Sequence, residues 1–157
     1  MPRAPFQVLV FPFRRLVSAD EHRVEFALFK RRSEGYWQPI AGGGEDEELP
    51  LESARREATE EGGILPSKKF FMLDTVTRIP AYFFRDRSIW PQSVYVIPNY
   101  CFAVELDTDC LTLSVEHTEF EWCGFERAYR LLYWEANRTA LWELNERLIN
   151  DDLPQPL

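Results

Sequence analysis

Residues 42–64 read GGGEDEELPLESARREATEEGGI, a triple-glycine turn followed by an acidic loop and a short glutamate-rich segment. Pro50 suits the first turn of a helix, because an amide N–H at that position has no intrahelical partner. Gly62 and Gly63 supply a left-handed stop at the other end. The stretch therefore predicts a helix that begins near Pro50 and ends at the glycine pair.

The two faces of this helix differ in chemistry. Leu51, Ala54 and Ala58 recur at i, i+3 and i+7 and form a narrow apolar seam that can pack on a sheet. Three glutamates at i, i+3 and i+4 share another face, where like charges repel. Local helix energetics do not explain them, whereas a hard divalent cation such as Mg²⁺ prefers oxygen ligands and offsets the repulsion. The three are Glu57, Glu60 and Glu61.

The spacing of the whole stretch is specific and resembles the Nudix box at each of nine defined positions. These are Gly42, Glu48, Arg56, Glu57, Ala58, Glu60, Glu61, Gly63 and Ile64. A solvated acidic helix is the alternative interpretation, but it explains neither the glycines nor the arginine. The resemblance implies an α/β fold, a Nudix-type α/β/α sandwich around a central mixed β-sheet. It also implies an enzyme that hydrolyses a diphosphate linkage in a nucleoside diphosphate joined to another group.

Composition limits the class of protein. A chain of 157 residues that is 45% apolar and 15% aromatic suits one globular domain, taken as residues 1–157. The formal net charge is −8, and residues 45–61 hold eight acids against two arginines, a net −6. Most of the acidity therefore lies at the presumed metal site. The net negative charge argues against an extended nucleic-acid partner, because binding such a partner needs a basic surface. No long apolar run or cleavable signal is present, so we expect a cytoplasmic protein without a membrane partner.

Apolar patterning predicts strands over residues 7–13, 24–30, 69–84, 93–106 and 120–125, and helices over 126–133 and 136–150. Pro12 indicates an edge strand or a bulge, and Pro98 a bend or bulge. The strand over 24–30 fits a central position covered on both faces. In the last helix one face carries Leu141, Leu144, Leu148 and Ile149.

The resemblance assigns roles within the box. It implies that Glu57, Glu60 and Glu61 bind the metal together with the backbone carbonyl of Gly42, where a glycine lets the backbone approach the ion. Glu57 is the candidate for water activation, and Glu60 belongs with it in the catalytic set. Arg56 completes that set by orienting a neighbouring glutamate with its planar fork. The implied cofactor is Mg²⁺, with Mn²⁺ as the alternative.

A further carboxylate from outside the box commonly completes such sites. Glu116 and His117, followed by four residues and Trp122, match a pattern that many Nudix enzymes show, so Glu116 leads. Glu121 and Glu119 remain alternatives. For His117, packing in the protein interior competes with a role as a base or a phosphate contact.

Substrate contacts are predicted from basic residues beside aromatic ones. Arg78 and Arg85 flank the AYFF segment that contains Tyr82, so phosphate pairing and base stacking can be combined there. Arg31 follows a strand that leads toward the box. Solvation is the competing interpretation for each of these arginines.

Two family rules give conflicting substrates. Pro80 lies sixteen residues beyond Ile64, as in ADP-ribose pyrophosphatases, and Tyr82 lies eighteen beyond it, as in dinucleoside polyphosphate hydrolases. The tail, with Trp134 and Asn137 opening a helix, resembles the dihydroneopterin triphosphate and dATP pyrophosphohydrolase group.

The leading hypothesis is a Mg²⁺-dependent pyrophosphohydrolase that cleaves a nucleoside triphosphate, or a related nucleoside diphosphate-linked compound, to a monophosphate and pyrophosphate. The alternatives are an ADP-ribose or dinucleoside polyphosphate pyrophosphatase and a nucleotide sensor without catalysis. The expected partner is a small nucleotide, and homodimers are frequent in the superfamily.

Overall fold

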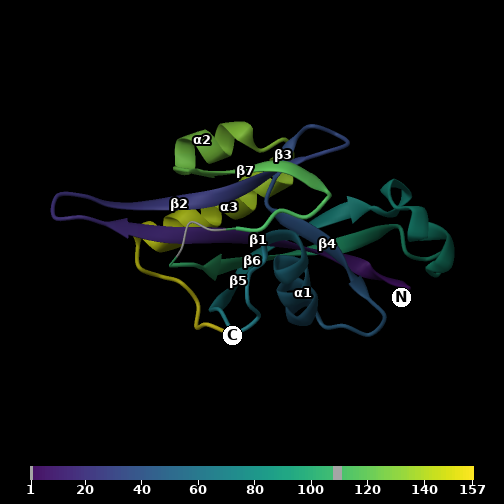
Figure 1. Cartoon of the computed structure of the whole chain (residues 1–157). Coiled ribbons are helices and arrows are strands. Elements are labelled where there is room, and N and C mark those ends of the chain that lie inside the picture. Colours follow the sequence, from purple (N-terminus) through teal and green to yellow (C-terminus); the bar gives the residue numbers. More distant parts are fainter. Residues whose placement is uncertain (1, 108–110) are drawn as a thin grey trace.

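The computed structural model describes residues 2–107 and 111–157, which form one mixed β-sheet between helices (Figure 1). The strands are β1 (Arg3–Val17), β2 (His22–Arg31), β3 (Trp37–Gln38), β4 (Ile40–Glu45), β5 (Phe70–Pro80), β6 (Val96–Glu105) and β7 (His117–Cys123). The α-helices are α1 (Pro50–Gly62), α2 (Phe125–Leu131) and α3 (Glu135–Ile149). Two 3₁₀ helices, η1 (Ala81–Phe83) and η2 (Arg85–Ile89), follow β5.

The main sheet path runs β3-β2-β1-β6-β5, with β4 paired to β1 and β7 paired to β2. The β1–β6 pair is parallel, and the other strand pairs are antiparallel. Helix α1 lies on one side of the sheet, and α2 and α3 lie on the other (Figure 1). The predicted sandwich around a mixed sheet is confirmed. Among the described residues, no helix is long and apolar enough to cross a membrane.

Alternation along β1 divides the core into two layers, because successive side chains of a strand point to opposite faces. Val8 and Val10 pack with Ala54 and Ala58 of α1. The intervening residues face the other helices in a layer that contains Leu9, Phe11, Phe13, Ala128, Leu141 and Leu144. The apolar seam predicted for residues 51–58 therefore does pack on the sheet.

Pro12 lies within the central strand β1, so the prediction that it marks an edge or a bulge is wrong. On one side β1 pairs with β4 up to Val10 and with β2 from Phe13 onward. Pro12 falls where β1 exchanges one neighbour for the other, so its missing N–H costs no ladder bond on that side. On the other side its register with Val104 of β6 continues without a shift.

The irregularity expected at Pro98 occurs instead in the neighbouring strand. Pro98 pairs in register with Arg78, whereas the β5–β6 register shifts between Met72 and Val76. The Glu143 carboxylate of α3 accepts hydrogen bonds from the Asp74 and Thr75 backbone N–H groups, both at 2.7 Å. These bonds satisfy the donors that the shift would leave unpaired.

Three further predictions are corrected. The three glycines at 42–44, expected to form a turn, lie within β4. The AYFF segment is not a strand, because β5 ends at Pro80 and the chain continues into η1 and η2. Ile149, placed by periodicity on the buried face of the last helix, is 69% exposed. It is the final residue of α3.

Candidate active site

Helix α1 carries two of the three predicted carboxylates into a buried position. It begins at Pro50 and is closed by Gly63, whose φ of 68° is left-handed and whose N–H donates to the Thr59 carbonyl at 3.0 Å. The alanines of α1 pack against the sheet, and this position leaves Glu57 8% exposed and Glu61 4% exposed. Burying two carboxylates on adjacent turns is costly unless a cation accompanies them.

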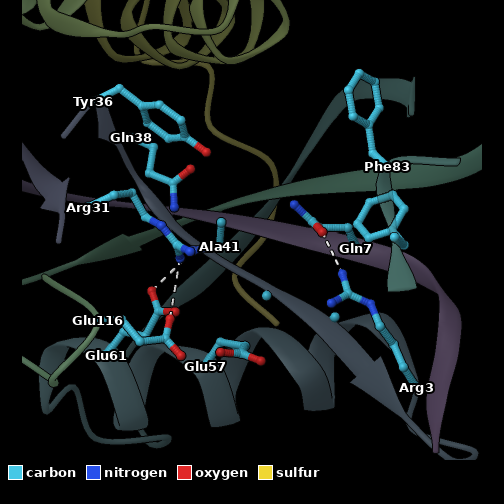
Figure 2. Close-up of a pocket in the computed structure, with 13 residues that line it drawn as sticks. Arg3, Gln7, Arg31, Tyr36, Gln38, Ala41, Glu57, Glu61, Phe83 and Glu116 are labelled. Atoms are coloured by element: carbon cyan, nitrogen blue, oxygen red, sulfur yellow. Dashed lines mark hydrogen bonds and ion pairs between the residues drawn. The ribbon is translucent and has the colours of Figure 1, made fainter. Parts of the chain in front are cut away.

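These two glutamates form part of the wall of a cavity of about 440 Å³. Figure 2 shows Glu57 and Glu61 rising from α1, with Glu116 beside Glu61 and Arg31 above both acids. Gly42 lies directly over Glu57, and a Cβ at that position would overlap the Glu57 carboxylate. The glycine therefore leaves the space that the acid occupies.

Arg56 holds the box together through five short contacts. Its Nε and Nη2 donate to the two carboxylate oxygens of Glu48 at 2.7 and 2.9 Å. Nη2 also donates to the Gly43 carbonyl at 2.9 Å, and Nη1 donates to Glu57 at 2.9 Å and to Glu60 at 3.3 Å. Arg56 does not line the cavity. Its geometry is that of a positioning group, because one planar guanidinium fixes the acidic loop, the glycine segment of β4 and Glu57 together.

The cavity carboxylates raise one another's proton affinity. Burial, followed by the nearby charges of Glu60 and Glu116, raises the pKa of Glu57 to about 7 against the opposing effect of Arg56. Burial together with the charges of Glu57 and Glu116 raises the pKa of Glu61 to about 9. The acids are therefore short of compensating positive charge.

That deficit fits a divalent cation. Among the described residues, no group of three or more His, Cys, Asp or Glu side chains is placed so that it could hold a metal ion by itself. Mg²⁺ does not require such a shell, since it keeps several waters and is commonly completed by substrate phosphates. Oxygen donors from α1, from the backbone of Gly42 in β4 and from Glu116 are the ligand type that it prefers.

Of the three outer carboxylates considered from the sequence, only Glu116 lines the cavity. Its Oε2 accepts from Arg31 Nη1 at 3.3 Å. Glu121 is instead ion-paired with Arg127, and Glu119 is exposed. The structure thus brings Glu116, Glu57 and Glu61 together, while Glu60 stays outside the cavity with its side chain 56% exposed.

His117 is packed inside the protein, 1% exposed. Its ring lies 5.4 Å from that of Phe29, centroid to centroid, and neither ring nitrogen has a hydrogen-bond partner in the described structure. Nε2 is 4.0 Å from the Glu61 carboxylate. Burial lowers the pKa of His117, which favours the neutral ring.

A second cavity, of about 460 Å³, adjoins the first. The two share Gln7, Tyr36, Gln38, Phe83 and Phe84 as lining residues. The part that belongs to the second cavity alone is bounded by aromatic, basic and carboxamide side chains, among them Trp134, Arg78, Asn99 and Asn137.

Ring contacts organise the aromatic part of this wall. Tyr36 stacks on Tyr133 with ring centroids 4.8 Å apart and planes 8° apart. Trp134 meets Tyr36 edge-on at 5.9 Å and Phe83 at 6.5 Å. Such a wall suits a flat, polarisable ring.

Two asparagines give this cavity unused hydrogen-bonding capacity. Asn137 is 4% exposed, and its side chain has no hydrogen bond within the described residues. Asn99 is 3% exposed, and its Nδ2 donates to Thr77 at 3.3 Å while its Oδ1 is unpartnered in the described structure. Buried polar atoms are normally paired, so a ligand edge with donors and acceptors fits here.

Two of the four predicted substrate residues line the adjoining cavities, and the other two do not. Arg31 lines the first cavity and Arg78 the second. Tyr82, 77% exposed, lines neither, and its neighbour Phe83 faces both. Arg85 lines a separate surface depression beside Trp90.

Sequence reasoning missed several cavity residues, namely Arg3, Gln7, Gln38 and Asn99. Arg3 and Gln7 are four apart on β1, and residues so spaced on a strand share a face. Extending the predicted first strand to Arg3 would have placed the pair together.

Comparison with known proteins identifies the family. The sequence model of the NUDIX domain matches residues 8–143, and the chain belongs to the NUDIX family. The rat bis(5'-nucleosyl)-tetraphosphatase [asymmetrical] is 30% identical over 139 residues, which cover 87% of this chain and 88% of that protein. The protein is a pyrophosphohydrolase, as its complete box predicted.

Solved structures show the same fold. A Listeria monocytogenes protein described as a NUDIX hydrolase superposes with a TM-score of 0.81 at 43% identity, covering 96% of this chain and 98% of that one. The Escherichia coli dihydroneopterin triphosphate pyrophosphohydrolase superposes with a TM-score of 0.70 at 20% identity, covering 91% and 97%. The family generally uses divalent metals such as Mg²⁺.

Proposed function

We propose that the protein hydrolyses a nucleoside 5′-triphosphate to the monophosphate and pyrophosphate in a Mg²⁺-dependent reaction. One observation carries the proposal. The first cavity, lined by Glu57, Glu61 and Glu116 (the carboxylate cavity), adjoins the second, which Trp134 lines (the aromatic cavity), and the two share five lining residues. A molecule with a polyphosphate at one end and a flat ring at the other matches that pair of environments.

The ring end is supported by stacking and by edge contacts. Tyr36, Phe83 and Trp134 supply aromatic surface. The carboxamides of Asn99 and Asn137 each carry both donor and acceptor atoms, and so do the edges of purine and pteridine rings. The E. coli structural relative acts on a pteridine triphosphate by its name, which is a substrate of this shape.

At the phosphate end, Glu57, Glu61, Glu116 and the Gly42 carbonyl would hold Mg²⁺, with Mn²⁺ as an alternative. Bound there, the ion would neutralise phosphate oxygens and lower the barrier to attack. Glu57, under Gly42 in the cavity wall, is the group we assign to receive the proton of the attacking water at a carboxylate oxygen. The water oxygen forms the new P–O bond, the bridging P–O bond breaks, and pyrophosphate leaves.

A dinucleoside polyphosphate is the second candidate substrate, favoured by the 30% identity to the rat tetraphosphatase. The exposed Tyr82 ring would supply a surface for a second base, because it lies 4.5 Å from the ring of Phe83, which lines both cavities. Cleavage would then give a nucleoside triphosphate and a monophosphate.

The test is a substrate panel with Mg²⁺ and product identification by ³¹P NMR. The panel contains the common nucleoside and deoxynucleoside triphosphates, dihydroneopterin triphosphate, ADP-ribose and diadenosine tetraphosphate. We expect pyrophosphate from a triphosphate, loss of turnover in Glu61→Gln, and unchanged turnover in Glu126→Gln, which alters an exposed acid of α2.

Each other product pattern overturns the triphosphate assignment. Products of diadenosine tetraphosphate or of ADP-ribose, formed faster than pyrophosphate from every triphosphate, would assign those substrates instead. Tight nucleotide binding without any turnover would leave a sensor.

A further inference from the structure

The carboxylate cavity contains one arginine that has no ion-pair partner among the described residues. Two arginines line this cavity, Arg3 from the start of β1 and Arg31 from the end of β2. Arg31 is ion-paired with Glu34 at 3.1 Å and with Glu116 at 3.3 Å. Arg3 takes part in no ion pair within the described residues, and its Nη2 donates only to the neutral side chain of Gln7, at 2.6 Å.

From this contrast we infer that Arg3 binds the polyphosphate chain of the substrate, on the wall of the cavity opposite Glu61 and Glu116. The inference rests on the proposed function and adds a substrate-binding residue that lies outside the box at 42–64. Figure 2 shows Arg3 and Arg31 on opposite sides of the cavity, with Glu57 between them.

Burial makes the missing partner significant. Nε of Arg3 is buried and has no hydrogen-bond acceptor in the described structure. Desolvation lowers the pKa of Arg3, and the charges of Asp86 and Glu57 only partly oppose it, neither acid being within ion-pair distance. A desolvated guanidinium with unused donors is costly. A phosphate, which accepts two parallel N–H bonds from one guanidinium, removes that cost.

The surroundings hold this guanidinium in one place. The Trp90 indole N–H donates to the Arg3 carbonyl at 2.7 Å, and the Asp46 N–H donates to the Pro2 carbonyl at 2.8 Å. The guanidinium carbon lies 4.7 Å from the centre of the Phe84 ring. Gly43 lies beneath it, where a Cβ would overlap the guanidinium. A preorganised donor loses less conformational entropy on binding than a free surface arginine does.

The experiment compares Arg3→Met with Arg3→Lys. Methionine keeps an unbranched apolar side chain over Phe84 and removes the charge. Lysine keeps the charge but lacks the planar guanidinium that donates two parallel hydrogen bonds. Arg15→Met is the matched control, because Arg15 lies on the same strand and pairs with Glu105 away from the cavity. Thermal denaturation tests whether each of the three variants is folded.

Binding is measured by calorimetry in Mg²⁺ with inorganic tripolyphosphate, with the α,β-methylene analogue of the preferred triphosphate and with the corresponding nucleoside. Loss of charge-assisted bonds predicts a Kd for both polyphosphates about 10- to 100-fold higher in Arg3→Met. A smaller rise is expected in Arg3→Lys and none in Arg15→Met. Nucleoside affinity is expected to stay the same in every variant.

Unchanged polyphosphate affinity in folded Arg3→Met would overturn the inference. So would an equal loss for the nucleoside and the polyphosphate, since a packing defect would affect both. Should Arg3→Met not fold, Arg3→Lys decides the question by the same comparison of polyphosphate with nucleoside. Tripolyphosphate binding does not require turnover, so Arg3 is tested even where the substrate panel rejects a triphosphate.

Discussion

Arg56 and Glu48 form a bidentate ion pair, in which Arg56 Nε lies 2.7 Å from one Glu48 carboxylate oxygen and Arg56 Nη2 lies 2.9 Å from the other. The pair joins the middle of α1 to the acidic loop that precedes it. Glu48 in turn accepts the Glu45 backbone N–H at 2.9 Å. The loop that follows the glycines of β4 is thus fixed to the helix that carries Glu57.

Arg56→Lys is predicted to weaken both the fold and the activity. Lysine keeps the charge but cannot make parallel bonds to Glu48 while also reaching Gly43 and Glu57. We expect a loss of roughly 1–3 kcal/mol in the free energy of unfolding and a lower kcat. Urea denaturation and steady-state kinetics measure both, with Arg130→Lys on exposed α2 as the control. Wild-type kcat in Arg56→Lys would contradict the positioning role.

Local rules explain why α1 and its acids could be predicted. Pro50 and Gly63 act on the backbone within one turn, and the spacing of Glu57 and Glu61 follows from helix geometry alone. The box therefore specifies its own conformation. What it leaves open is the depth to which each acid is buried, and Glu60, equivalent by spacing, lies outside the cavity.

The aromatic cavity could not be predicted in the same way. Tyr36, Arg78, Phe83, Asn99 and Asn137 come from five separate segments and meet only after β1 has paired with β6 and α3 has packed on the sheet. The AYFF segment shows the same limit, because aromatic residues favour strands while Pro80 ends β5.

Gly42→Ala is predicted to reduce turnover strongly, because the new Cβ would occupy the space of the Glu57 carboxylate. Either that acid or the β4 backbone must shift, and displacement of a reacting group by about 1 Å can cost about 100-fold in rate. Gly124→Ala is the matched control, since a Cβ there meets no atom within 4 Å and its φ of −67° suits alanine. Equal kcat/KM values for the two variants would show that the space above Glu57 is not required.

Removal of divalent metal is predicted to make stability fall as pH rises. The pKa of Glu57 is raised to about 7 and that of Glu61 to about 9, against a usual value of 4.5. The folded chain therefore binds more protons than the unfolded chain between these values, so the free energy of unfolding decreases with pH from about 4.5 to 9. In EDTA we expect Tm to be several degrees lower at pH 8.5 than at pH 5.5, since 1 kcal/mol shifts Tm by roughly 2–4 °C at this chain length.

The control for that pH dependence is Glu61→Gln, which removes the more strongly shifted acid. Its Tm in EDTA is expected to exceed that of the wild type at pH 8.5 and to vary less with pH, although turnover is lost. Mg²⁺ should raise the wild-type Tm at pH 8.5 more than the Glu61→Gln Tm. A wild-type Tm in EDTA that rises between pH 5.5 and 8.5 would contradict the assignment of buried, mutually repelling carboxylates.

Asn137→Leu is predicted to impair recognition of the base without impairing the chemistry. Asn137 is 4% exposed, and its side chain has no hydrogen bond within the described residues. Leucine has a similar size but lacks the carboxamide. Loss of one or two bonds to the ring edge predicts a kcat/KM for the preferred triphosphate about 3- to 30-fold lower. Affinity for inorganic tripolyphosphate should be unchanged, because that compound has no ring.

Asn150→Leu, at the exposed end of α3, is the control. An equal loss for the triphosphate and for tripolyphosphate would assign Asn137 a purely structural role, and no loss for either would place the base outside the aromatic cavity.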